Sequence, residues 1–363
     1  SGDDGLQHGD VNGRHWWPSE VDVSIRPGWF YHPEEDAQVH SLEHLLDIWY
    51  HSVGRGSCLN LNFPPDRRGL IHENDAERIR EFKIVLDKTF SVNFAAGASV
   101  RASNERGPDF RGERMTDGSP DTFWAPEDGV TECEAVLELG KIRRLNVVSL
   151  KEYTQLGERV AAFSIEYRTP SGEWKKLIDD TTISFRKILR TETVETDALK
   201  LKITNALACP CIQEFSAYYQ PPLRFAPVIA RETDGTITLT SPSNEVCIHY
   251  TLDNSVPDAD SPEYTGPFRI REAGILRAIS VLRPGVENAY PEIRSNPESL
   301  LRFGVAMDEW RVLGADSEYD WNNRKENLLS SDRKLWLTGK DAPYPHWIAV
   351  DTGKKQQIRG LIV

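Results

Sequence analysis

The sequence has 363 residues and a formal net charge of −13. The length predicts roughly two to four domains. No lysine- or arginine-rich segment stands out, which argues against nucleic-acid binding, and no apolar run is long enough to span a membrane. Ten tryptophans are many for this length. Their faces suit either stacking on sugar rings or filling cores, and composition alone does not decide between the two.

The five cysteines are few, odd in number and scattered. Cys209 and Cys211 are separated by one residue, which is the wrong spacing for a CxxC redox or zinc pair. We expect mostly buried thiols, with one disulfide as the alternative, and the cysteines do not indicate a compartment.

Strand and helix patterns alternate through the first 93 residues. Apolar residues alternate with polar ones in Val21–Ile25, and a helical pattern runs from the acidic segment at Pro33 to Tyr50. Ser57–Phe63 has the pattern of a short buried strand, and Asn74 is the predicted cap of a second helix. This order is typical of an α/β fold. Two such units cannot close a barrel, so we expect the remainder before Ser1.

Short alternating runs replace the helical periodicity after Phe94. Glu134–Leu139, Phe163–Tyr167 and Leu199–Ile203 are the clearest, with glycine and proline turns between them. The pattern predicts an all-β sandwich that ends at a linker, Pro221-Pro222.

Two further β segments follow the linker. A smaller module has predicted strands at Thr236–Thr240 and Cys247–Thr251, and new strand signals begin near Phe303. An internal repeat links this last segment to the sandwich, because Val136–Lys141 is echoed by Ala349–Lys354. A tryptophan precedes each copy, at positions 124 and 336. We therefore expect a second copy of the sandwich, present to about its halfway point.

The first 93 residues resemble the C-terminal part of the (β/α)8 barrel of glycoside hydrolase family 29, the α-L-fucosidases. The matching segments are Trp17–Glu20, Ser24–His32 with the run S-I-R-P-G-W-F-Y-H, Ser52–Ser57 and Asn60–Gly69. The resemblance implies that Val21–Ile25 and Cys58–Asn62 are the seventh and eighth barrel strands.

The β segments resemble other families. Phe94–Tyr219 is similar to a discoidin (factor 5/8 type C) domain, also known as carbohydrate-binding module family 32, through Thr116–Trp124 and through Leu156–Val160, where Glu158 replaces the usual glutamine. Residues 223–296 resemble the small C-terminal module of chitobiase. Residues 303–363 resemble the first half of a second discoidin domain.

Together these features predict a multidomain protein: the C-terminal part of a (β/α)8 barrel followed by all-β sandwich modules. The predicted boundaries are 1–93 for the barrel part, 94–220 for a discoidin-like jelly roll, 221–302 for a small Ig-like β module, and 303–363 for a partial second discoidin-like domain.

The resemblance implies a retaining exo-α-L-fucosidase, secreted or periplasmic, that hydrolyses terminal α-1,3/1,4-linked fucose from oligosaccharides or glycoconjugates without a catalytic cofactor. Retaining glycosidases use two carboxylates about 5–5.5 Å apart. No residue here matches the family's nucleophile motif, so we expect that aspartate before residue 1. The alternative is a carbohydrate-binding array of discoidin-like modules with no catalysis.

Five residues are candidates for this chemistry. Glu20 is a candidate acid/base or substrate-recognition group, with a structural carboxylate as the alternative. Arg26 is a candidate sugar ligand, with a buried ion pair as the alternative. Trp17 and Trp29 suit packing against fucose or filling a core, and His32 suits donation to a sugar hydroxyl or burial in a core.

Three residues of the predicted sandwich are candidate calcium ligands. Asp117, Thr122 and Glu214 supply oxygen atoms at positions where discoidin modules often hold a structural Ca²⁺. The alternative is a hydrogen-bonded turn without a metal.

Overall fold

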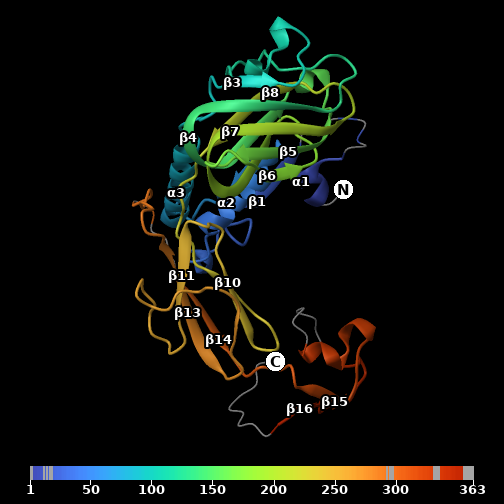
Figure 1. The fold of residues 1–363 in the computed structure, drawn as a ribbon. Coiled ribbons are helices and arrows are strands. Elements are labelled where there is room, and N and C mark those ends of the chain that lie inside the picture. The colour runs from blue at the N-terminus through green and yellow to red at the C-terminus, as the bar shows by residue number, and fades with distance from the viewer. Residues whose placement is uncertain are drawn as a thin grey trace. The chain divides into compact units, whose positions relative to one another are not determined.

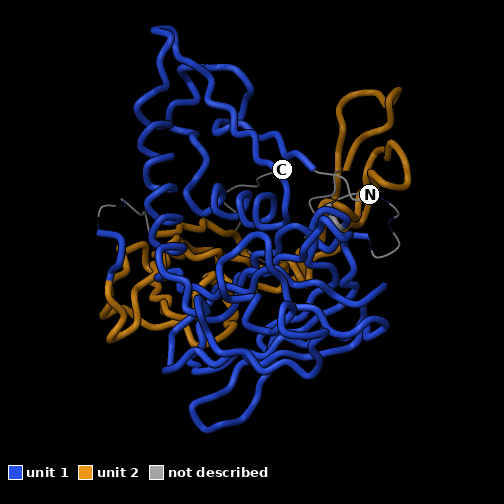
Figure 2. Tube along the Cα trace, turned by 90° about the horizontal axis from the view of Figure 1, so that it is seen from above, with its two compact units in different colours: residues 1–221, 288–293 blue, residues 222–287, 294–363 orange. Residues whose placement is uncertain are grey.

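The computed structural model describes residues 3–10, 13, 15, 19–291, 293, 298–329 and 336–354. The chain divides into two compact units, shown in two colours in Figure 2. Unit 1 comprises Ser1–Pro221 with Asn288–Ile293, and unit 2 comprises Pro222–Glu287 with Arg294–Val363.

Unit 1 begins with a short parallel sheet and the helices that follow its strands. The elements are α1 (Asp3–His8), β1 (Glu20–Ser24), α2 (Leu42–His51), β2 (Cys58–Asn62) and α3 (Glu73–Thr89). β1 and β2 pair in parallel along their whole length, from Glu20 opposite Cys58 to Ser24 opposite Asn62. The predicted order of strand, helix, strand and helix is therefore present, whereas closure into a barrel stays a prediction.

The two helices begin at different residues than predicted. The acidic segment forms a single 3-10 turn, Pro33–Glu35, and α2 starts only at Leu42, where the Ser41 hydroxyl accepts a hydrogen bond from the His44 N–H at 3.1 Å. His72 caps α3 instead of Asn74, because its Nδ1 accepts from the Asn74 N–H at 3.2 Å. Both predicted starts were wrong because local cap signals recur within a few residues.

The second part of unit 1 is an antiparallel β-sandwich. Its strands are β3 (Ser99–Ala102), β4 (Cys133–Glu152), β5 (Val160–Arg168), β6 (Trp174–Asp180), β7 (Lys187–Ala206) and β8 (Ile212–Tyr218). They pair in the order β3-β4-β7-β5-β6, and β8 pairs with the other side of β4 (Figure 1). The three predicted strand segments lie within β4, β5 and β7. Alternate residues point inward, and Trp124, Phe163 and Phe215 are fully buried in one continuous apolar core.

The helices of unit 1 pack directly against the sandwich. Tyr50 of α2 is buried with Val147 of β4 and Ile188 of β7. At the rim, the Arg190 guanidinium forms an ion pair of 2.8 Å with Asp47. The two parts of unit 1 are therefore joined by both apolar and charged contacts.

Unit 2 begins with two three-stranded antiparallel sheets. Their orders are β12-β10-β9 and β11-β13-β14, built from β9 (Val228–Arg231), β10 (Thr236–Thr240), β11 (Val246–Thr251), β12 (Phe268–Arg269), β13 (Gly274–Leu282) and β14 (Glu298–Phe303). Ile237, Leu239 and Leu276 are buried between the sheets. The strands predicted at 236–240 and 247–251 are confirmed as β10 and β11.

The last described segment shares local features with the start of the sandwich. β15 (Arg311–Ala315) pairs antiparallel with β16 (Ile348–Asp351), as β3 pairs with β4. The Trp336 indole N–H donates to the Ser317 carbonyl at 3.0 Å, and that of Trp124 donates to the Asn104 carbonyl at the same distance. These parallels support the internal repeat, although the final repeat strand, residues 361–362, lies outside the described residues, and a partial second domain stays a prediction.

Candidate functional site

The parallel strands β1 and β2 end side by side, at Ser24 and Asn62. The Asn62 amide donates to the Ser24 hydroxyl at 3.2 Å and to the Trp29 carbonyl at 2.8 Å, and the Ser24 hydroxyl donates to the Gly28 carbonyl at 2.8 Å. These bonds hold the loop after β1 against the end of β2. In α/β folds, ligands bind at the carboxyl ends of parallel strands, so this edge is the first place to look for a site.

Five polar and aromatic residues gather at this edge, and we call them the strand-end cluster: Arg26, Tyr31, Asp36, His72 and Asp75. Arg26 Nε donates to both carboxylate oxygens of Asp75, at 2.9 and 3.2 Å, and its Nη1 donates to Asp36 at 2.9 Å. The Arg26 guanidinium also lies 4.8 Å from the centre of the Tyr31 ring. One cation therefore links the loop after β1 to the first turn of α3.

Asp36 is the second centre of the cluster. Its Oδ2 accepts a hydrogen bond from the Tyr31 hydroxyl at 3.3 Å, and the His72 Nε2 lies 3.3 Å from the same oxygen. Because His72 Nδ1 accepts a backbone N–H at the start of α3, its Nε2 is the nitrogen that carries the proton, and it faces Asp36. The tautomer of His72 is thus set by the helix cap.

Burial makes the charges of the cluster strongly interdependent. Arg26 is 1% exposed and Asp75 is fully buried. Burial alone would lower the pKa of Arg26, but its hydrogen bonds to Asp75 and Asp36 outweigh that effect and raise it. Arg26 Nη2 is buried and has no hydrogen-bond partner among the described residues. It is the one nitrogen of this guanidinium without a hydrogen bond to the described residues.

A second polar turn follows β2. The Arg68 guanidinium donates to Asp66 at 2.9 Å from Nε, and its Nη2 bonds Glu73 at 2.8 Å. The hydrogen bond from Arg68 outweighs burial and lowers the pKa of Asp66 to about 2. Asp66 is therefore ionised near neutral pH, and its bonds with Arg68 hold the turn against the first residue of α3, Glu73.

The structure brings some predicted sugar-binding residues to this edge and not others. Arg26 lies at the centre of this edge. It forms a buried ion pair, which was the alternative to sugar binding in the sequence analysis. Trp29 is 48% exposed on the same loop, and His32 is exposed where the 3-10 turn begins. Glu20 is exposed at the amino end of β1, four residues before Ser24, or roughly 13 Å away at the rise of a strand. Trp17 lies outside the described residues.

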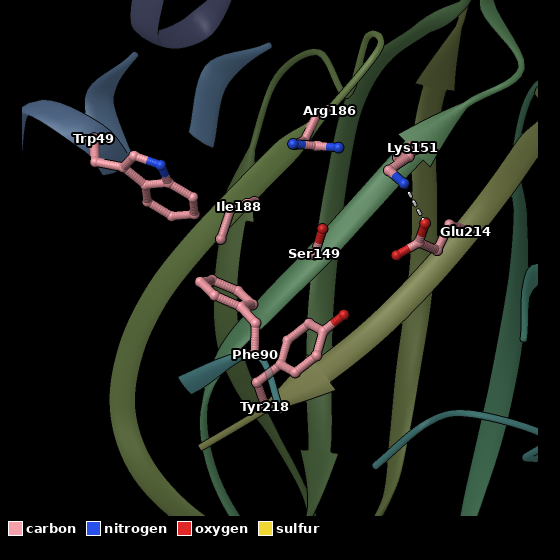
Figure 3. Close-up of a pocket in the computed structure, with 8 residues that line it drawn as sticks. All are labelled: Trp49, Phe90, Ser149, Lys151, Arg186, Ile188, Glu214 and Tyr218. Atoms are coloured by element: carbon pink, nitrogen blue, oxygen red, sulfur yellow. Dashed lines mark hydrogen bonds and ion pairs between the residues drawn. The ribbon is translucent and has the colours of Figure 1, made fainter. Parts of the chain in front are cut away.

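The predicted calcium ligands do not converge. The Thr122 hydroxyl donates to both oxygens of Asp117, at 2.8 and 2.9 Å, which is a hydrogen-bonded turn. Glu214 forms an ion pair with Lys151 (Figure 3), and it accepts a hydrogen bond from the Ser216 hydroxyl. Its neighbour Gln213, on the opposite face of β8, is the residue that contacts the turn region. Calcium at these positions stays a prediction.

Four residues of the cluster were not foreseen as site residues: Tyr31, Asp36, His72 and Asp75. His72 and Asp75 lie at the start of α3, and Asp36 follows the 3-10 turn Pro33–Glu35; acidic and capping residues are common at such positions for local reasons. The available signal was their position in the segments that follow strands β1 and β2, since such loops build sites in α/β folds. Without the fold, a role of these residues in a site could not be distinguished from helix capping.

Two negative findings apply to the described residues only. Among them, no group of three or more histidine, cysteine, aspartate or glutamate side chains is arranged to hold a metal ion. Within the same residues, no helix combines the length and apolar composition needed to cross a membrane. All five cysteines are described, and all are free thiols, four of them buried.

Two family descriptions match parts of the chain. Residues 99–208 match the F5/8 type C domain, as expected for the sandwich. Residues 237–288 match the family described as Fn3 associated, within the small β module of unit 2. The discoidin resemblance of the first sandwich is therefore confirmed.

The chain is also similar to α-L-fucosidases. α-L-fucosidase 1 of Arabidopsis thaliana is 37% identical over 239 residues, which cover 64% of this chain and 46% of the relative. Among solved structures, a provisionally assigned α-L-fucosidase of Bacteroides thetaiotaomicron shares 40% identity with a TM-score of 0.57, covering 60% of this chain and 48% of that one. A Ruminococcus gnavus GH29 fucosidase in complex with fucose shares 32% identity with a TM-score of 0.55, covering 58% and 43%. The chain thus spans less than half the length of these relatives.

Proposed function

We propose that the protein containing this chain is an α-L-fucosidase that hydrolyses terminal α-linked fucose from glycans. The similarity to fucosidases at 32–40% identity over about three fifths of the chain carries this proposal. We further propose a retaining mechanism and a preference for α-1,3/1,4 linkages, as the S-I-R-P-G-W-F segment suggests, and a secreted or periplasmic location. The strand-end cluster supports the proposal because it lies where such folds bind ligands.

The strand-end cluster would form one wall of the substrate site. Its ion pairs hold the loop after β1, which presents Trp29 (48% exposed) and Phe30 (74% exposed) to solvent. Aromatic faces of this kind suit the apolar face of a sugar ring. The Asn62 amide holds the Trp29 backbone by a hydrogen bond. The aromatic platform of Trp29 and Phe30 is therefore ordered before a sugar binds, and binding costs little conformational entropy.

The cluster carboxylates are poor candidates for the two catalytic groups. Asp36 and Asp75 both accept hydrogen bonds from Arg26, and these bonds occupy oxygens that a nucleophile would need. Glu20 is exposed at the far end of β1. We therefore place the nucleophile and the acid/base in other segments of the fucosidase domain, and assign positioning to the residues described here.

The direct test is fucose release by the full-length protein. The substrates are trisaccharides with α-1,3- or α-1,4-linked fucose, with an α-1,2-linked fucoside as the linkage comparison. We expect release from the first two and slower release from the third, with the α-anomer as first product by NMR. Release of the β-anomer would contradict retention, and no release from any fucoside would contradict the activity itself.

A Trp29→Ala variant tests the role of the platform. Because Trp29 is half-exposed, we expect folding to be unaffected and KM for the trisaccharide to rise about tenfold, in line with the loss of one stacking contact of about 1.5 kcal/mol. Exposed Leu70, on the turn after β2, gives a matched control as Leu70→Ala. Equal kinetics for Trp29→Ala and the wild type would exclude Trp29 from substrate binding.

The second candidate function is sugar binding without catalysis. The match of residues 99–208 to the F5/8 type C domain favours it. Titration of the whole protein with galactosides and fucosides, with and without a fucosidase inhibitor that blocks the catalytic site, separates the two. Binding that survives the inhibitor supports a site in the sandwich.

A further inference from the structure

A pocket of about 200 Å³ lies within unit 1, where the helices meet the sandwich. It is lined by residues from five segments: Trp49, Phe90, Ser149, Lys151, Arg186, Ile188, Glu214 and Tyr218 (Figure 3). Trp49 comes from α2 and Phe90 follows α3, whereas the other residues belong to the sandwich. The pocket is therefore distinct from the strand-end cluster.

One side of the pocket is apolar and aromatic. The ring centres of Trp49 and Phe90 are 5.3 Å apart, and those of Phe90 and Tyr218 are 4.9 Å apart. Buried Ile188 completes this wall. Because the rings brace one another at interplanar angles of 47° and 72°, the wall is preformed, and each ring is a separate apolar surface for a ligand.

The other side is polar and carries a net positive charge. Lys151 and Glu214 form an ion pair, so their charges cancel within the pocket. No carboxylate among the described residues forms an ion pair with Arg186. Its guanidinium carbon, Cζ, lies 5.8 Å from the centre of the Phe185 ring. In Figure 3 the Arg186 guanidinium lies over the pocket, on the same side as Lys151. Although the chain has a net charge of −13, Arg186 is therefore a cation of the pocket without an ion-pair partner among the described residues.

The two walls together restrict the ligand. An arginine guanidinium binds carboxylates in a two-pronged geometry, while a Trp–Phe wall suits the apolar face of a pyranose. The volume is below the roughly 300–1,000 Å³ of pockets for drug-sized ligands, so one sugar ring fits better than an oligosaccharide. We propose that this pocket binds an acidic monosaccharide of the uronic-acid class, with its carboxylate on Arg186 and its ring against Trp49 and Phe90.

Hydroxyl groups of the sugar have partners as well. Ser149 and the Tyr218 hydroxyl lie between the two walls, and the Lys151–Glu214 pair offers one donor and one acceptor at the edge (Figure 3). Such mixed donors and acceptors match vicinal hydroxyls. The inference does not depend on the proposed fucosidase activity, because fucose is neutral and would act at another site.

The experiment is calorimetric titration of the full-length protein with sodium D-glucuronate. Methyl β-D-glucopyranoside is the ring without the charge, and sodium acetate is the charge without the ring. We expect saturable binding of glucuronate and at least tenfold weaker binding of either control. Equal binding of acetate would show a bare anion site, equal binding of the neutral glycoside would remove the role of charge, and no binding of glucuronate would overturn the proposal outright.

Variants locate the binding. Arg186→Gln removes the cation, and we expect it to weaken glucuronate binding about tenfold or more, as for a lost charged hydrogen bond. Arg101→Gln is the matched control, since Arg101 is an exposed arginine of β3 outside the pocket. Thermal unfolding of both variants verifies that they fold. Glucuronate binding that is unchanged in Arg186→Gln, or equally weakened in both variants, would place the sugar elsewhere.

Discussion

The strand-end cluster and the sandwich core belong to the same unit but are held together by different forces. The cluster buries charge: Arg26 is 1% exposed and lies against a fully buried Asp75. The sandwich buries apolar side chains, among them Phe163, Leu201 and Phe215, with almost no exposed area. The same degree of burial therefore contributes differently to the free energy of unfolding in the two regions.

A buried ion pair adds little net stability, because desolvating both charges cancels much of their attraction. An apolar core adds stability in proportion to the area removed from water. The cluster thus mainly holds the segments after β1 and β2 in position, and the sandwich core provides most of the stability of the unit. The difference is consistent with a site on the first region and a scaffold in the second.

The largest expected effect comes from breaking the cluster. Arg26→Ala would leave the Asp75 carboxylate buried without its partner, so we expect a loss of about 4 kcal/mol in the free energy of unfolding of this region. Chemical unfolding followed by circular dichroism measures it. Arg26→Lys keeps the charge but not the fork of donors, and its loss should be clearly smaller; equal losses would mean that geometry, not charge, dominates.

Next is a cavity in the sandwich. Leu201→Ala removes a fully buried side chain of β7, and we expect a loss of about 3 kcal/mol. Proton exchange of backbone amides should show the loss across the sandwich. Exposed Leu207, just after β7, provides the control as Leu207→Ala, with an expected change within about 0.5 kcal/mol. A core that tolerates Leu201→Ala without loss would contradict the scaffold role.

A third prediction concerns Glu152, a buried carboxylate within the sandwich scaffold. Glu152 accepts backbone N–H groups of Arg159, Val160 and Ser184, yet burial raises its pKa from 4.5 to about 7. The folded state therefore binds the proton more tightly than the unfolded state. Its contribution to stability is greatest at low pH and falls as the pH rises from about 4.5 to 7.

Between pH 5 and pH 8 we expect this group to lower the free energy of unfolding by about 2 kcal/mol. Glu152→Gln cannot ionise, so across that range the free energy of unfolding of the wild type should fall relative to that of the variant, as measured by guanidinium unfolding. Glu127→Gln, at an exposed site of the same domain, is the control. A constant difference between pH 5 and pH 8 would show that Glu152 is ionised throughout.

The smallest expected effect concerns the two matching tryptophans. Trp336→Phe removes an indole hydrogen bond to the Ser317 carbonyl, which costs about 1 kcal/mol. Trp124→Phe removes the equivalent bond and also leaves a void in a fully buried site, so its loss should be larger. Thermal unfolding of both variants compares them. A larger loss for Trp336→Phe would contradict the equivalence of the two segments.

Several elements could be predicted from local pattern. β2, β10 and β11 follow the predicted ranges within one residue, because alternation of apolar and polar residues depends only on the pleat of a strand. Helix starts were less certain: α2 begins nine residues after the acidic segment at Pro33, since several residues there can cap a helix. The resemblance through Ser24–His32 and Thr116–Trp124 correctly indicated similarity to α-L-fucosidases and to the F5/8 type C domain.

The residues of the site show the limit of this approach. Arg26 could be singled out because it follows a strand, but its partner Asp75 lies 49 positions later, and sequence spacing cannot pair them. Similarly, the contact of Glu214 with Lys151 could not be predicted from the sequence, and calcium at Glu214 stays a prediction. Strand alternation puts Glu214 on the opposite face of β8 from Gln213, which contacts Pro120.

The sequence by itself therefore determined the order of strands and helices, the sandwich, the internal repeat and the fucosidase resemblance, because each is encoded over short or continuous stretches. Only the tertiary structure decided which charges meet. It joined the loop after β1 to the start of α3 through Arg26, and it assembled the Trp49–Arg186 pocket from segments more than one hundred residues apart. Parallel strands and packed helices bring such residues together, and no local pattern records that contact.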